Sequence, residues 1–223
     1  MQTVHRTERR RRMTNIENIF ICMAAPLIIA TVATKGRGRR MLIFMIAGMT
    51  SCLLSSYIST FIAVVQGVDL FTASLEISPL AEEILKFCPA LFFIIVFEPD
   101  KSGTADACVM IAIGFATFEN VCFIIMNGAD NLINLTIRGL GTGAMHVVCG
   151  SIIAFGLLHL WDRLWLRAAG TVALLCVAVT YHGVFNVLVS QTGIPMIIGF
   201  MIPLVTTAGL SLLGRRIDSM EIA

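Results

Sequence analysis

Seven polar side chains stand inside stretches of the sequence that are otherwise apolar. They are Glu82, Glu83, Lys86, Glu119, His146, His182 and Asn186. Placing one charged side chain at the centre of a membrane helix costs about 2.5–3.5 kcal/mol on insertion scales. Side chains that are kept at such a cost usually face a protein interior or a wet cavity, where they take part in chemistry or transport.

The spacing of these residues predicts that several share a helix face. Lys86 follows Glu82 by four residues and Glu83 by three, so the three side chains can meet on one side of a helix. His182 and Asn186 are also four residues apart and point the same way. Carboxylates, imidazoles and an ammonium group would then lie together within apolar segments.

Local signals around these residues support a built site. Ser78 and Pro79 are typical of the N-cap and first residue of a helix. Pro89 frees the carbonyl of Leu85, and such a kink could open a polar cleft. Small residues that allow helices to approach closely surround His146 in the sequence: Gly139, Gly141, Gly143 and Gly150.

The composition predicts that the elements carrying these residues are membrane helices. The chain of 223 residues is 57% hydrophobic and 13% charged, and its mean hydropathy of +0.87 lies outside the range of soluble domains. Spans of about 20 apolar residues are found at 16–33, 41–65, 77–97, 104–127, 137–159, 168–189 and 194–213. We expect an all-α, polytopic membrane helix bundle of about seven transmembrane helices.

These spans divide the chain into four parts. Residues 1–15 form a basic leader, 16–65 two N-terminal membrane helices, 66–213 the bundle that carries the polar residues, and 214–223 a C-terminal tail. Successive helices run in opposite directions, and each polar residue lies toward the same end of its helix. The polar side chains therefore fall in one layer roughly 8–14 Å below one membrane surface.

Loop charges predict the orientation of the bundle, because Lys and Arg favour cytoplasmic loops. Alternate loops carry nine Lys and Arg residues on one side and only Arg138 on the other. The C-terminus is then cytoplasmic, and the polar layer is extracytoplasmic. Five arginines within 6–12 would lie outside under this topology. Either the first apolar stretch, with Glu17 and Asn18, is re-entrant, or translation begins at Met13, which we favour.

Four motifs follow one another on successive predicted helices. They are Glu82-Glu-Ile-Leu-Lys86, Phe115-Ala-Thr-Phe-Glu119, His146-Val-Val-Cys-Gly150 and His182-Gly-Val-Phe-Asn186. Together they closely resemble the PrsW family of intramembrane proteases over about residues 78–190. That family is related to the CAAX prenyl proteases, the bacteriocin-processing enzymes and the scaffold subunit of gamma-secretase. The first two predicted helices lie outside the region of resemblance.

The resemblance implies a multi-pass peptidase of the cell membrane. Its substrate would be a single-pass membrane protein cut near the outer surface, as in site-1 cleavage of an anti-sigma factor. We expect the lipid bilayer and this substrate as partners, and no nucleic acid. Peptide hydrolysis needs an activated water, a stabilised oxyanion and an acid for the leaving amine.

The residues can be given roles in that reaction as a hypothesis. Glu83 is the expected general base, and Glu82 paired with Lys86 would anchor the site. His182 and Asn186, on one helix face, could both donate to the oxyanion. All seven residues of the motifs are thus candidate catalytic residues.

Two mechanisms remain open for Glu119 and His146. With His182 they offer ligands suitable for Zn²⁺, with Glu83 as base. Alternatively they orient the water in a metal-free glutamate protease. The related CAAX-type enzymes, which carry His at the position of Glu119, look able to work in this way. The metal-free scheme is slightly favoured, because the chain lacks the His-Glu-x-x-His arrangement of a zinc protease helix.

Two other functions compete with the protease. A non-catalytic scaffold subunit would keep the polar residues only for helix packing, but the intact Glu-Glu-x-x-Lys motif argues against it. A proton-coupled transporter would also use buried Glu and His residues. Its usual mark is a repeat with broken helices in both halves, and the sequence shows no such repeat.

Overall fold

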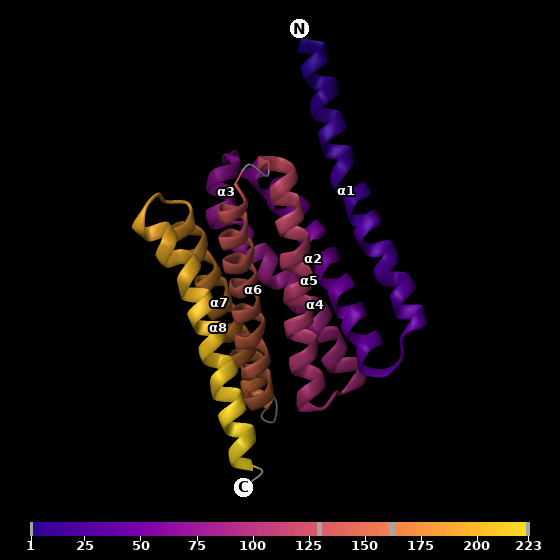
Figure 1. The fold of residues 1–223 in the computed structure, drawn as a ribbon, viewed down its shortest axis with the longest axis vertical. Helices are drawn as coiled ribbons and strands as arrows, with labels where there is room; N and C mark the ends of the chain where they lie inside the picture. The colour runs from indigo at the N-terminus through magenta and orange to yellow at the C-terminus, as the bar shows by residue number, and fades with distance from the viewer. Residues whose placement is uncertain (1, 129–130, 161–163, 222–223) are drawn as a thin grey trace.

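The computed structural model describes residues 2–128, 131–160 and 164–221, and every element in these ranges is a helix (Figure 1). The elements are α1 (Gln2–Ala33), α2 (Gly36–Gln66), α3 (Leu70–Glu76), α4 (Ser78–Phe97), α5 (Lys101–Asn127), α6 (Leu132–Leu160), α7 (Leu164–Val189) and α8 (Ile194–Glu221). The predicted all-α membrane bundle is confirmed.

Six of these helices are long and apolar enough to cross a membrane: α1, α2, α5, α6, α7 and α8. Helix α4 has 20 residues, about the length of a span, and it carries Glu82, Glu83 and Lys86. The seven predicted spans therefore correspond to α1, α2 and α4–α8. The sequence did not predict the short helix α3.

Helix α3 begins at a well-formed N-cap. The Asp69 carboxylate accepts hydrogen bonds from the backbone N–H groups of Phe71 and Thr72 at 2.9 and 3.0 Å, and from the Thr72 hydroxyl at 2.7 Å. An Asp at this position satisfies N–H groups that have no partner inside the helix. The cap fixes the start of α3, the short helix that connects α2 to α4.

Helix α4 follows α3 almost without a break. The N–H of Ile77 donates to the carbonyl of Ala73 at 3.0 Å, and the carbonyl of Ile77 accepts from Ala81 at 3.1 Å. Ser78 is therefore the first helical residue of α4, and the expectation that it is the N-cap is wrong. Pro79 does lie in the first turn, where a missing N–H has no cost.

The carbonyl freed by Pro89 faces a hydroxyl group of α2. Helix α4 continues through Pro89 to Phe97, and the carbonyl of Leu85 lies 2.9 Å from the hydroxyl of Ser51 in α2. A neighbouring Ser commonly satisfies a carbonyl that proline frees in a membrane helix. Helix α2 thus supplies a donor for the freed carbonyl, and the predicted polar opening stays a prediction.

Glycines bring α2 and α5 into backbone contact. A Cβ added to Gly48 would lie 2.0 Å from the carbonyl oxygen of Ile111, and one added to Gly114 would lie 2.1 Å from that of Met45. No side chain fits at either position. Small residues at helix crossings are the usual means of close packing in membranes.

Glycines of α6 play unequal parts in packing. A Cβ on Gly150 would come within 2.9 Å of the carbonyl oxygen of Cys108, and one on Gly141 would meet the ring of Phe200 at 2.6 Å. The predicted close approach is confirmed at these two positions. Around Gly143, the described residues leave open space within 4 Å.

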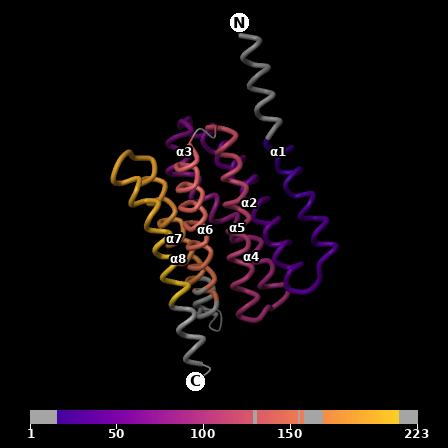
Figure 2. Tube along the Cα trace, in the orientation of Figure 1, coloured from indigo at the N-terminus to yellow at the C-terminus, as the bar shows by residue number. Residues whose placement is uncertain are grey.

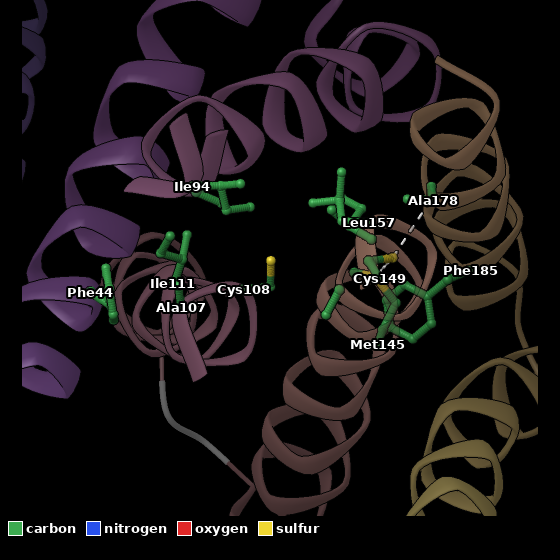
Figure 3. Close-up of a cluster of buried hydrophobic side chains, with 13 residues drawn as sticks. Phe44, Ile94, Ala107, Cys108, Ile111, Met145, Cys149, Leu157, Ala178 and Phe185 are labelled. Carbon is green, nitrogen blue, oxygen red and sulfur yellow. Dashed lines mark hydrogen bonds between the residues drawn. The ribbon is translucent and has the colours of Figure 1, made fainter. Parts of the chain in front are cut away.

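Helices α4, α5, α6 and α7 enclose the interior of the bundle. Helix α4 packs on α5 and α7, and α6 packs on the same two helices from the other side. Helix α8 lies against α6 and α7 at the edge of the bundle away from α1 (Figure 2). Figure 3 shows the apolar core that fills this interior; Met145 and Cys149, which bracket His146 in the sequence, point into it.

Candidate active site

The two neighbouring glutamates of α4 have different environments. Nζ of Lys86 lies 2.5 Å from Oε1 of Glu83, and the side chains are 5% and 1% exposed. The expectation that Lys86 pairs with Glu82 is therefore wrong. Residues three apart on a helix can meet as readily as residues four apart, and here the closer pair forms. Glu83 is a bound anion, and Glu82 is left for other partners.

Lys86 also joins α4 to α6. Its ammonium nitrogen lies 2.8 Å from Nδ1 of His146 and 4.5 Å from the centre of the Phe115 ring. A lysine ammonium can only donate hydrogen bonds, so Nδ1 of His146 is the acceptor. Phe115 is itself fully buried and packs against the His146 ring, with the ring centres 4.9 Å apart.

His146 connects this pair to α5. Its Nε2 lies 2.6 Å from Oε2 of Glu119, and the His146 side chain is completely buried. Since Nδ1 accepts from Lys86, the ring proton sits on Nε2 and is donated to the carboxylate. Both ring nitrogens of His146 thus have partners, and its tautomer is fixed.

His182 of α7 faces both glutamates of α4. Its Nδ1 lies 2.7 Å from Oε1 of Glu83, so the ring proton is on Nδ1 and is donated to Glu83. Nε2 lies 3.6 Å from Oε2 of Glu82, and in the neutral ring it presents a lone pair toward that oxygen. This Glu82 oxygen is buried and has no hydrogen-bond partner among the described residues. Two acceptors face each other, and a donor between them would satisfy both.

Six of the seven predicted residues come together from four helices. We call Glu82, Glu83, Lys86, Glu119, His146 and His182 the polar cluster. Asn186 lies outside it, because its amide donates to the carbonyl of Ser74 in α3 at 3.0 Å. The expectation that Asn186 and His182 both donate to an oxyanion stays a prediction; without substrate, the Asn186 amide is turned to α3.

Sequence reasoning missed Arg138, which it counted only as a loop charge. The guanidinium of Arg138 in α6 donates to Oδ1 of Asn120 at 2.6 Å and lies 3.5 Å from Oε1 of Glu119. It also stacks on the Phe123 ring, 3.4 Å from the ring centre. The available signal was position, since Arg138 precedes His146 by eight residues, about two turns of the same helix.

The cluster offers ligands for a metal ion, but not the predicted set. Ligand atoms of Glu82, His146 and His182 lie within 4.8 Å of one another, so Glu82 stands where Glu119 was expected. Two imidazoles and a carboxylate form a common set for catalytic zinc. Both nitrogens of His146, however, are already hydrogen-bonded to Lys86 and Glu119. A metal ion could therefore bind His146 only after one of these two contacts was broken.

Comparison with known families gives this geometry a context. The sequence model described as "PrsW family intramembrane metalloprotease" matches residues 36–210, most of the chain. The chain belongs to the PrsW family. It is a multi-pass membrane peptidase, as the motifs implied. No curated protein and no solved structure matches the chain.

The PrsW-family match is longer than the region of resemblance read from the motifs. It begins at residue 36 and so includes the whole of α2. The expectation that the first two helices lie outside the shared region is wrong for α2. Through Ser51, α2 supports the carbonyl of Leu85, one residue before Lys86.

Proposed function

We propose that this PrsW-family protein is an intramembrane endopeptidase of the glutamate type, with Glu82 as general base in place of the expected Glu83, which is already bonded to Lys86 and His182. The observation that carries the proposal is the 3.6 Å approach of Oε2 of Glu82 to Nε2 of His182, which are two facing acceptors when the imidazole is neutral. A buried carboxylate oxygen without a partner is costly, and such groups are retained where they do chemistry. A water molecule there can donate one hydrogen to each acceptor.

The reaction follows from these two acceptors. As the water oxygen attacks the carbonyl carbon of the scissile peptide bond, Glu82 takes one of its protons. The resulting tetrahedral intermediate collapses, the C–N bond breaks, and Glu82 returns the proton to the leaving amine. One water is consumed, and one new carboxyl and one new amino terminus are formed. Such positioned proton transfer contributes typically 10²–10⁴-fold to a rate.

The rest of the polar cluster holds His182 and Glu82 in place. Glu83 accepts from Nδ1 of His182 and so keeps the Nε2 lone pair directed at Glu82. Lys86 neutralises Glu83. His146 in turn accepts from Lys86 and donates to Glu119. Each proton position in this chain is set by the next residue, so the base is organised before substrate arrives.

The proposed substrate is a single-pass membrane protein, such as an anti-sigma factor, cut near the extracytoplasmic face of the cell membrane. The loop charges support this side. Glu82 and Glu83 lie near the beginning of α4, and Glu119 and His182 lie toward the ends of α5 and α7; these ends face the loops poor in Lys and Arg, while His146 lies at the midpoint of α6. Loops rich in Lys and Arg favour the cytoplasm, which also places the C-terminus there.

A comparison of membranes tests the function. Cells carrying the wild-type protein, Glu82→Gln or the control Glu98→Gln are compared by quantitative proteomics of single-pass proteins and released ectodomains. Glu98 is an exposed carboxylate at the end of the same helix. We expect one or more full-length anchored proteins to accumulate with Glu82→Gln only. Matching profiles at equal expression would overturn the peptidase and favour the scaffold function.

A further inference from the structure

Arg138 lies outside the four motifs, yet it is bonded to the end of the polar cluster. It is in the second turn of α6, about 12 Å before His146 along the helix axis. Its side chain is 20% exposed, and a partly buried guanidinium needs partners for its donors. All of the partners that the structure gives it are on α5.

Three residues of α5 receive the guanidinium. Nη1 donates to Oδ1 of Asn120 at 2.6 Å, Nη2 lies 3.5 Å from Oε1 of Glu119, and the guanidinium plane lies over the ring of Phe123. The amide of Asn120 also donates to the carbonyl of Gly139 in α6, at 3.4 Å. Arg138 and Asn120 thus clip α5 to α6 beside the cluster.

Glu119 belongs both to this contact between α5 and α6 and to the polar cluster. Its Oε1 faces Arg138 and its Oε2 accepts from His146. A carboxylate held at both oxygens cannot rotate without breaking one contact. The Glu119 side chain is 31% exposed, so without Arg138 it could turn toward water and release His146. His146 positions Lys86, and Lys86 positions Glu83.

We propose that Arg138 is a positioning residue for peptide hydrolysis, acting through Glu119 and His146; this rests on the proposed function. The role requires arginine. A lysine would keep the charge but lose the planar fork that reaches Asn120 and Glu119 together, and it would stack poorly on Phe123. The loss caused by Arg138→Lys therefore measures geometry and not net charge.

The test uses purified full-length protein and a substrate found by the membrane comparison. We expect Arg138→Lys to lower kcat by about 10–100-fold, the range for displaced supporting residues, with KM changed less than about twofold. The matched control is Arg37→Lys, which alters an arginine–aspartate pair between α2 and α5, 2.7 Å from Asp106. It should leave kcat and KM unchanged.

A double-mutant cycle identifies the route. If Arg138 acts through Glu119, Arg138→Lys should lower kcat less than about twofold further in a Glu119→Gln background. Equal losses in both backgrounds, a wild-type kcat for Arg138→Lys, or a rise in KM alone would each overturn the proposal. Asn120→Ala, which releases the same guanidinium, is the second variant if Arg138→Lys does not accumulate. Cleavage by wild type but not by Glu82→Gln keeps the function separate from this outcome.

Discussion

Lys86 and Glu83, three residues apart on α4, form a buried ion pair with 2.5 Å between Nζ and Oε1. Because of this contact, the two adjacent glutamates have different partners. Oε1 of Glu83 is hydrogen-bonded to Lys86 and to Nδ1 of His182. One oxygen of Glu82, in contrast, is buried and has no partner among the described residues. Substituting each glutamate separately therefore should affect cleavage and thermal stability differently.

Glu82→Gln and Glu83→Gln should differ in kind. We expect Glu82→Gln to lower cleavage by about 10²–10⁴-fold, the usual contribution of a general base, with little change in thermal stability in detergent. Glu83→Gln leaves the Lys86 ammonium buried without a counter-ion, which costs about 3–5 kcal/mol. Thermal unfolding and cleavage are measured for both. Equal stability of the two variants would contradict the assignment of the ion pair.

Glycine contacts should control the stability of the α2–α5 crossing. Gly114→Ala places a Cβ 2.1 Å from the carbonyl oxygen of Met45, and overpacking of this kind costs typically 1–3 kcal/mol or more. Gly209→Ala in α8 meets nothing within 4 Å among the described residues. There the better helix propensity of Ala should leave stability equal or higher. The unfolding temperature in detergent measures both, and equal losses would show that the crossing is looser than described.

Removal of metal should not stop the reaction. Both nitrogens of His146 are occupied by Lys86 and Glu119, so we expect cleavage to persist after 1,10-phenanthroline and dialysis. Metal analysis should find far less than one zinc per chain. A soluble zinc protease treated alongside checks that chelation was complete. Loss of cleavage that is restored by Zn²⁺ would show that His146 exchanges a hydrogen bond for a metal ion.

The cap of α3 should loosen in acid. Hydrogen bonds from the Thr72 hydroxyl and backbone hold the pKa of Asp69 below its ordinary value. A carboxyl group whose pKa is lower in the folded state stabilises that state fully at pH values above its unfolded pKa, which is near 4. This contribution to stability is lost as the pH falls through the folded pKa. Hydrogen exchange at Phe71 and Thr72, corrected for intrinsic rates, should therefore accelerate below about pH 4.

Asp69→Asn provides the control for this acid response. Asn caps a helix about as well as Asp but does not titrate, so its protection of α3 should not change over the same pH range. If exchange in Asp69→Asn accelerates as strongly as in the wild type, the loosening does not come from the Asp69 carboxylate.

The sequence predicted the helices and most residues of the polar cluster, but not which of these residues bond to one another. Apolar length identifies spanning helices directly, and the single layer of polar residues correctly brought Glu119, His146 and His182 to α4. Spacing could not decide which glutamate binds Lys86, because positions three and four residues away are both neighbours on a helix. The choice depends on His182, 99 positions beyond Glu83.

Other contacts that the sequence could not predict also involve distant partners. The carbonyl of Leu85 is satisfied from α2 by Ser51, and the amide of Asn186 is taken by Ser74 in α3. Neither partner carries a local signal. Helix α3 was missed because seven residues are too few to show a period, although Asp69 followed by a short apolar run was its available mark.

Cleavage in a defined membrane tests directly whether the protein hydrolyses a peptide bond with Glu82 as general base. Purified wild-type protein and Glu82→Gln are placed in liposomes with the substrate identified by proteomics, and the fragments are mapped by mass spectrometry in ¹⁸O-labelled water. We predict that the wild type produces one cut near the membrane surface with ¹⁸O in the new carboxyl group, and that Glu82→Gln leaves the substrate intact. Cleavage by Glu82→Gln at the wild-type rate would show that Glu82 is not the base, and an intact substrate with the wild type would show that the protein does not cleave it.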